Sequence, residues 1–269
     1  MRFSGSLACA AILASATALT LSPARATDVG VDVALVIAGD VSGSMEPGEL
    51  RLQRDGFAAA FRHPDVLKVI GSSMTGRIAV TYVEWAGPEE HWIIAPWTII
   101  SDGADAIAFA ALVSAAAPVS GTHTALSNGL IFAAAQFRTL GTTAMRQTID
   151  ISGDGLNSAG LPLAQARQFV LDLGITINGL TFPEASEGYP DYAAYMVGSS
   201  TVGLARYYQD CVVGGPGGFA MSVEEPAQFP TVIRRKVALE IAALPDQVTY
   251  ANFTFAGDAA RDCSGFYAK

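Results

Sequence analysis

The sequence predicts a doubly wound α/β domain, with a mostly parallel sheet, one antiparallel edge strand and helices on both faces. Short apolar runs alternate with segments of helical periodicity along most of the chain. The run VDVALVIA at residues 31–38 is almost continuously apolar, as expected of a central strand covered on both faces. Strands joined through helices form right-handed crossovers and therefore parallel sheets. No repeat or linker divides residues 31–244, so we expect a single domain.

The elements of the first half follow from the spacing of apolar residues. After the strand at 31–38, apolar residues on one face predict a helix over 48–62. Two apolar, strand-like runs, 77–85 and 91–97, are separated by a Gly-Pro turn, which predicts a hairpin and hence the antiparallel strand. An Ala-rich helix is expected over 103–116.

The second half repeats this alternation. Helices are expected where apolar residues recur three and four positions apart, at 124–138, 161–173 and 227–243. Strands are expected at 145–152 and 175–182, with a last edge strand at 219–223. The stretch 183–217 is rich in Pro, Gly and Ser, so we expect a loop with one short helix around residues 192–197.

Residues 1–26 are expected to be a secretory signal peptide. Arg2 gives a short positive start, residues 7–21 form an apolar run, and an Ala-Arg-Ala cleavage pattern follows. The apolar run is shorter than the ~20 residues that span a bilayer, so a membrane anchor is the weaker alternative. We therefore expect a domain at 27–244, a C-terminal tail at 245–269, and a periplasmic or secreted protein.

The charge balance excludes nucleic acids as partners. The chain has 16 Lys and Arg against 25 Asp and Glu, a net charge of −9, and no basic cluster for nucleic-acid phosphates. Removal of the signal peptide takes away two arginines and no acidic residue, which makes the charge −11. No later segment is apolar for long enough to suggest a membrane span.

Two cysteines, Cys211 and Cys263, remain after cleavage. In an oxidising compartment such a pair most simply forms one disulfide, which would tie the tail back to the domain. Two unpaired, buried thiols are the alternative.

Oxygen-bearing side chains follow the expected strands. Asp40, Ser42 and Ser44 form a D-x-S-x-S pattern after the first strand, Thr122 precedes a helix, and Asp154 follows a later strand. Because ligands bind at the carboxyl ends of strands in doubly wound sheets, we expect these five side chains to meet. Two carboxylates and three hydroxyls suit a hard cation, Mg²⁺ or Mn²⁺. A cation held mainly by neutral hydroxyls would seek one more anionic oxygen, such as a partner's carboxylate.

Each of these residues also has a purely structural interpretation. Ser44 or Glu46 could cap the helix that follows them. Asp154 lies between two glycines and could be a turn residue. Thr122 or Thr124 could cap the next helix.

The segments DVSGSM, GTHTAL and GDG, each beside an expected strand or helix, resemble a von Willebrand factor A-type domain over residues 31–244. Such domains bear a metal-ion-dependent adhesion site. The resemblance implies that Asp40, Ser42, Ser44, Thr122 and Asp154 are metal ligands, and that the partner is a protein presenting an acidic residue to the ion. The segment YYQDCVVGGPGGFA further resembles an exported bacterial subgroup of unassigned function.

Catalysis is not expected. No serine lies in a G-x-S-x-G elbow, no phosphate-binding G-x-x-x-x-G-K-[ST] loop is present, and none of the three histidines has a motif-level acid partner. His123 is expected to lie beside the site without binding metal. The leading hypothesis is an exported, metal-dependent protein-binding module. The alternatives are a metal-dependent hydrolase that uses the same ion and a structural domain with a vestigial site.

Overall fold

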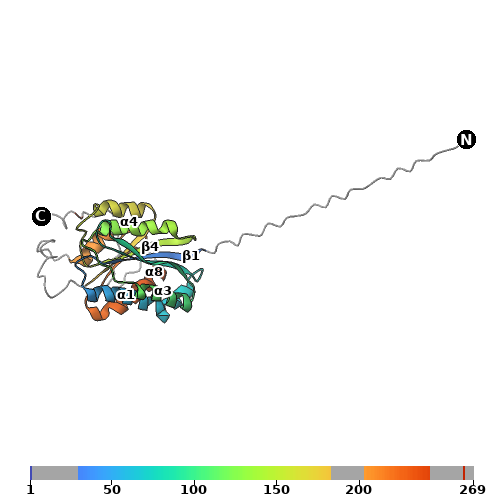
Figure 1. Cartoon of the computed structure of the whole chain (residues 1–269), viewed down its shortest axis with the longest axis horizontal. Helices are drawn as coiled ribbons and strands as arrows, with labels where there is room; N and C mark the ends of the chain where they lie inside the picture. The colour runs from blue at the N-terminus through green and yellow to red at the C-terminus, as the bar shows by residue number, and fades with distance from the viewer. Residues whose placement is uncertain (2–29, 183–202, 243–262, 264–269) are drawn as a thin grey trace.

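A computed structural model describes residues 30–182 and 203–242, together with Met1 and Cys263. Three predictions lie outside the described residues, apart from Met1 and Cys263: the signal peptide, the short helix around residues 192–197, and the tail at 245–269. A six-stranded sheet runs through the described part, with helices on both sides (Figure 1).

The sheet has the strand order β3-β2-β1-β4-β5-β6. The central strand β1 pairs in parallel with both β2 and β4, whereas β3 pairs antiparallel with β2 at one edge. The predicted fold class is therefore confirmed. The strands are β1 (Val31–Asp40), β2 (Ile78–Trp85), β3 (His91–Ile100), β4 (Ala144–Gly153), β5 (Thr176–Thr181) and β6 (Ala220–Ser222).

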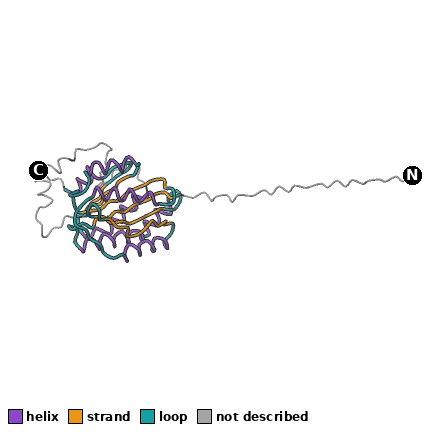
Figure 2. The backbone as a smooth tube through the Cα atoms, turned by 45° about the horizontal axis from the view of Figure 1, so that its top comes forward, coloured by secondary structure: helices purple, strands orange, loops and turns teal. Residues whose placement is uncertain are grey.

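Helices form a layer on each face of the sheet (Figures 1 and 2). One layer consists of α1 (Pro47–Arg62), α2 (Pro64–Ser72), α3 (Gly103–Ala115) and α8 (Phe229–Ala242). The other consists of α4 (Leu126–Gln136), α5 (Leu163–Asp172), α7 (Leu204–Tyr207) and the π-helical turn η2 (Tyr208–Val212). Short 3₁₀ turns, η1 (Phe137–Thr139) and η3 (Pro226–Gln228), follow α4 and precede α8.

The position of β1 in the sheet explains why its sequence is apolar except for Asp32 and Asp40. All ten of its residues are buried. Leu35 and Ile37 pack into the core below α1, α3 and α8, while Val36 and Ala38 pack into the core below α4 and α5. Because both faces are covered, neither could carry a solvated polar residue.

The first layer contains one helix that the sequence does not predict. The helix expected over 48–62 is confirmed as α1, but a second helix, α2, starts directly after it. His63 separates the two and caps α2, since its Nδ1 accepts a hydrogen bond from the Asp65 N–H at 3.1 Å. Pro64 then occupies the first turn, a position where its missing N–H costs nothing.

Cys211 and Cys263 form a disulfide, with Cα atoms 5.9 Å apart. The bond joins η2 to a residue 52 positions later, as the cysteine count predicts. Among the helices that the structure describes, none has the length and hydropathy needed to cross a membrane.

Candidate metal site

Four of the five expected ligands meet at the carboxyl edge of the sheet. Asp40 ends β1, and Asp154 directly follows the neighbouring strand β4. The backbone N–H of Ser42 donates to Asp40 Oδ1 at 2.7 Å, and the Ser42 and Ser44 hydroxyl oxygens lie 3.2 Å apart. Ser44 Oγ donates to Asp154 Oδ1 at 2.9 Å. A continuous chain of polar contacts therefore links these four residues.

The residues at the helix N-caps show that the hydroxyls of Ser44, Thr122 and Thr124 do not cap helices. Glu46, and not Ser44, stands at the N-cap of α1, where it exchanges hydrogen bonds with the third helical residue. Ala125 stands at the N-cap of α4, so neither Thr122 nor Thr124 caps that helix.

The fifth expected ligand, Thr122, lies in the adjacent loop. The Gly121 N–H donates to the Val41 carbonyl at 2.8 Å, which holds this loop against the D-x-S-x-S turn. Thr122 Oγ1 lies 2.8 Å from His123 Nδ1 and 3.4 Å from both carboxylate oxygens of Glu90. Among the described residues, no hydrogen bond joins Thr122 to the other four. The structure places it at the rim.

Glu90 is a residue of this rim that no sequence pattern indicates. Its Oε2 accepts hydrogen bonds from the N–H groups of Thr122 and Gly87, both at 2.9 Å. These bonds hold the pKa of Glu90 below its ordinary value. In the sequence Glu90 is only part of a hairpin turn, and its contact with the later loop depends on tertiary structure.

The two acidic residues are poorly solvated. Asp40 is fully buried, and its Oδ2 has no hydrogen-bond partner among the described residues. Burial raises the pKa of Asp40 well above its ordinary value, and the negative charge of Asp154 raises it further, against hydrogen bonds from Ser42. Burial also raises the pKa of Asp154, although the bond from Ser44 opposes this effect.

A divalent cation would relieve both carboxylates, because a nearby positive charge favours their ionised forms. The donor set consists of carboxylate and hydroxyl oxygens, which suit Mg²⁺ or Mn²⁺. Among the described residues no three of His, Cys, Asp and Glu gather into a cluster that could hold a metal. The residues present therefore fit a hydroxyl-rich site and not a zinc site of the Cys and His kind.

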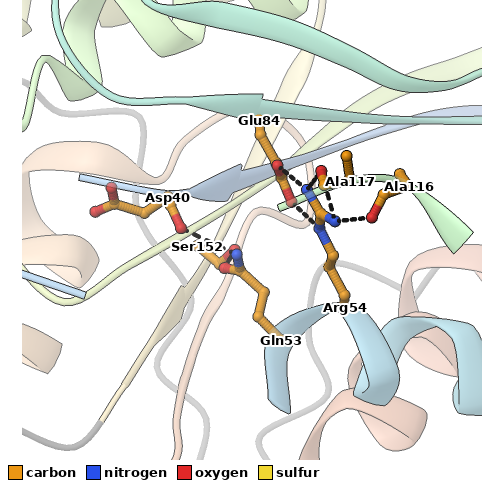
Figure 3. A network of polar contacts seen from close by, with 7 residues as sticks. All are labelled: Asp40, Gln53, Arg54, Glu84, Ala116, Ala117 and Ser152. Carbon is orange, nitrogen blue, oxygen red and sulfur yellow. Dashed lines mark hydrogen bonds and ion pairs between the residues drawn. The ribbon is translucent and has the colours of Figure 1, made fainter. Parts of the chain in front are cut away.

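Gln53 of α1 holds the ends of two strands together beneath the site (Figure 3). Its Nε2 donates to the Asp40 carbonyl at 3.0 Å, and its Oε1 accepts from Ser152 Oγ at 2.8 Å. Gln53 is fully buried, so both groups depend on these partners. The side chain thereby fixes the end of β1 relative to the end of β4.

The next residue, Arg54, anchors the segment that leads to Thr122 (Figure 3). Its guanidinium makes two hydrogen bonds of 2.6 Å to the Glu84 carboxylate, which is fully buried. It also donates to the carbonyls of Ala116 at 2.7 Å and Ala117 at 3.2 Å. Adjacent residues of one helix thus hold four chain segments in place, namely the ends of β1 and β4, the strand β2 and residues 116–117.

Comparison with known proteins decides the family. The family described as "Protein of unknown function (DUF1194)" matches residues 30–245. The chain belongs to this family. No curated protein matches it in sequence.

Similar solved structures include three proteins from different sources. The pilus adhesin SpaC from Lactobacillus rhamnosus GG has a TM-score of 0.55 at 11% identity, over 78% of this chain and 31% of SpaC. A von Willebrand factor type A protein from Catenulispora acidiphila has a TM-score of 0.52 at 15% identity. The match covers 79% of this chain and 43% of the Catenulispora chain. The third is proximal thread matrix protein 1 from the mussel byssus, in a structure with a zinc-occupied MIDAS motif. It has a TM-score of 0.50 at 12% identity, and the match covers 80% of this chain and 47% of the mussel chain.

This chain therefore spans less than half the length of these three proteins. At such identities the likeness concerns the fold. The fold is that of a von Willebrand factor A-type domain, which confirms the resemblance of the sequence at that level.

Proposed function

We propose that this chain is an exported protein-binding module that captures a carboxylate of a partner protein through a bound divalent cation, Mg²⁺ or Mn²⁺. The observation that carries the proposal is the polar chain Asp40–Ser42–Ser44–Asp154, with contacts of 2.7 to 3.2 Å. The zinc-occupied MIDAS motif of the mussel protein, which shares the fold, supports a divalent cation at this position. The signal-like residues 1–26 and the disulfide support export.

The proposal assigns the ion to Asp40, Ser42, Ser44 and Asp154, with Thr122 as the ligand from the adjacent loop. Asp40 and Ser42 are buried, whereas Ser44 and Thr122 are exposed. The site is therefore closed on the side of the sheet and open on the side of Ser44 and Thr122. Because three of the five donors are neutral hydroxyls, the ion would keep a strong attraction for an incoming carboxylate.

Peptide display on the immobilised Mg²⁺-loaded protein tests this function. The proposal predicts that selected peptides share an Asp or Glu, that EDTA releases them, and that Asp154→Asn fails to hold them. Peptides without acidic residues, or peptides that stay bound in EDTA, would contradict carboxylate capture. Phe169→Ser, on the exposed face of α5 and remote from the site, is the control: it should hold the selected peptides as the wild type does, unless they adsorb to exposed apolar surface.

A metal-dependent hydrolase is the second candidate, because the structure places an imidazole beside the site. His123 Nδ1 lies 2.8 Å from Thr122 Oγ1, within reach for proton transfer. Turnover of a nitrophenyl phosphate or ester separates the two functions. The binding module predicts no turnover above that of Asp40→Ala. Turnover that disappears in both Asp40→Ala and His123→Ala would establish the hydrolase.

A further inference from the structure

Tyr208, the first residue of η2, approaches the metal site from the side of the helices α4 and α5. The Tyr208 side chain is fully buried, and its hydroxyl has no hydrogen-bond partner among the described residues. The same holds for Asp40 Oδ2. Buried polar atoms without partners are rare in folded proteins, so two of them in one place need an explanation.

Gly153 shows how close these two atoms lie. A Cβ atom built on Gly153 would stand 2.7 Å from Asp40 Oδ2 and 2.7 Å from the Tyr208 hydroxyl oxygen. At most twice that distance therefore separates the two oxygens, which is within the span of one bridging water. A Cβ atom at position 153 would force one or both of these groups to move, so glycine permits their close approach.

The Tyr208 hydroxyl is the donor of this pair. A phenol carries its proton at neutral pH and offers one O–H. Asp40 Oδ2, as part of a carboxylate, offers only acceptor sites.

We infer that Tyr208 is a positioning residue of the metal site, whose hydroxyl donates to Asp40 Oδ2, directly or through one water, when the cation is bound. The inference rests on the proposed function, since the hydrogen bond matters only if Asp40 holds an ion. Carboxylates that bind metals are themselves hydrogen-bonded, which fixes their orientation and their ionised state. Tyr208 supplies this partner from a segment of the chain far from the three ligand loops.

A purely structural role for Tyr208 makes a different prediction. The ring packs edge-on against Tyr207, with centroids 6.1 Å apart, and lies in the core between α4, α5 and the sheet. If only this packing mattered, phenylalanine would replace tyrosine without consequence for metal binding. The hydroxyl alone distinguishes the two roles.

The experiment compares Mg²⁺ and Mn²⁺ binding by calorimetry in the wild type, Tyr208→Phe and Tyr82→Phe. Tyr82 is a matched control: it is equally buried and its hydroxyl also has no hydrogen-bond partner among the described residues, but it lies in the core on the other face of the sheet. We expect Tyr208→Phe to bind metal about 10- to 100-fold more weakly and Tyr82→Phe to bind as the wild type does. Mg²⁺ should also change the tyrosine absorption spectrum of the wild type and Tyr82→Phe, but not that of Tyr208→Phe.

Two results would overturn the inference, and they are distinguishable. Equal affinity in the wild type and Tyr208→Phe would exclude a role for the hydroxyl and leave the metal site intact. Absence of binding in the folded wild type would remove the proposed function, and this inference with it. Urea denaturation in chelator verifies folding, and Tyr208→Phe should be at least as stable as the wild type because it removes a buried hydroxyl without a partner.

Discussion

Replacement of Asp40 by asparagine should stabilise the metal-free protein while it abolishes metal binding. The Asp40 carboxylate is fully buried, lies close to the negative charge of Asp154, and has one oxygen without a partner. Asparagine keeps an oxygen that can accept the 2.7 Å hydrogen bond from the Ser42 N–H. It removes the charge that the fold accommodates poorly.

The size of the effect follows from the burial of that charged group. A buried polar atom without a partner costs about 1–3 kcal/mol, and more when it is charged. We therefore expect Asp40→Asn to increase the free energy of unfolding at neutral pH by about 1–3 kcal/mol in the presence of chelator.

The pH dependence has a definite sign. Because the pKa of Asp40 is raised in the folded state, the native protein binds this proton more tightly than the unfolded chain. The unfolding free energy of the wild type therefore falls as pH rises from the ordinary value of 3.8 through the raised value. Asparagine does not titrate, so its advantage should be largest at neutral pH and small below about pH 4.

Urea denaturation in chelator at several pH values measures this, with Asp32→Asn as the matched control. Asp32 is also buried on β1, but Ser73, Thr75 and Arg77 donate hydrogen bonds to its carboxylate. Burial alone would raise the pKa of Asp32, yet these bonds lower it, so Asp32→Asn should destabilise the fold. If Asp40→Asn destabilises the metal-free protein as Asp32→Asn does, the reasoning about the site is wrong.

Three further predictions concern the scaffold. Arg54→Ala should destabilise the protein by about 3–5 kcal/mol in urea denaturation, since it leaves the Glu84 carboxylate buried and unpaired. A loss within about 0.5 kcal/mol, as for a surface substitution, would contradict this prediction. Cys263→Ser should lower the free energy of unfolding by about 2–4 kcal/mol, and thermal unfolding of the variant should be the same with and without dithiothreitol. If dithiothreitol destabilises the variant further, Cys211 pairs with another cysteine. Burial raises the pKa of Glu240 from 4.5 to about 8, so wild-type stability should fall as pH rises across this interval, by at most on the order of 5 kcal/mol. Glu240→Gln should flatten this pH profile, and parallel profiles for the two proteins would refute the prediction.

The fold was largely predictable because its signals are local. Between Asp32 and Asp40 the strand β1 is apolar because both of its faces are covered, and the turn between β2 and β3 is visible as a Gly-Pro pair. The helix α2 was missed because the His63-Pro64 junction resembles a helix end and the next helix has only nine residues. The turn η2 was missed because it occupies five residues next to a loop-rich stretch.

The candidate site was predictable only in part, for a physical reason. Asp40, Ser42 and Ser44 lie on one turn, and parallel strand pairing brings Asp154 to them, so spacing and topology suffice. Glu90 and Tyr208 belong to the surroundings of the site through tertiary contacts alone. A buried tyrosine or a glutamate in a hairpin turn has no sequence pattern that distinguishes such a position from an ordinary one.

Calorimetric titration of Mg²⁺ and Mn²⁺ into the chelator-treated protein, beside Asp40→Ala, decides whether the polar chain at the sheet edge is a metal site. We predict binding to the wild type and its loss in the folded variant, because Asp40 is the buried carboxylate of the set. No binding heat from a folded wild type, or equal binding in Asp40→Ala, would contradict the metal site and leave only the fold.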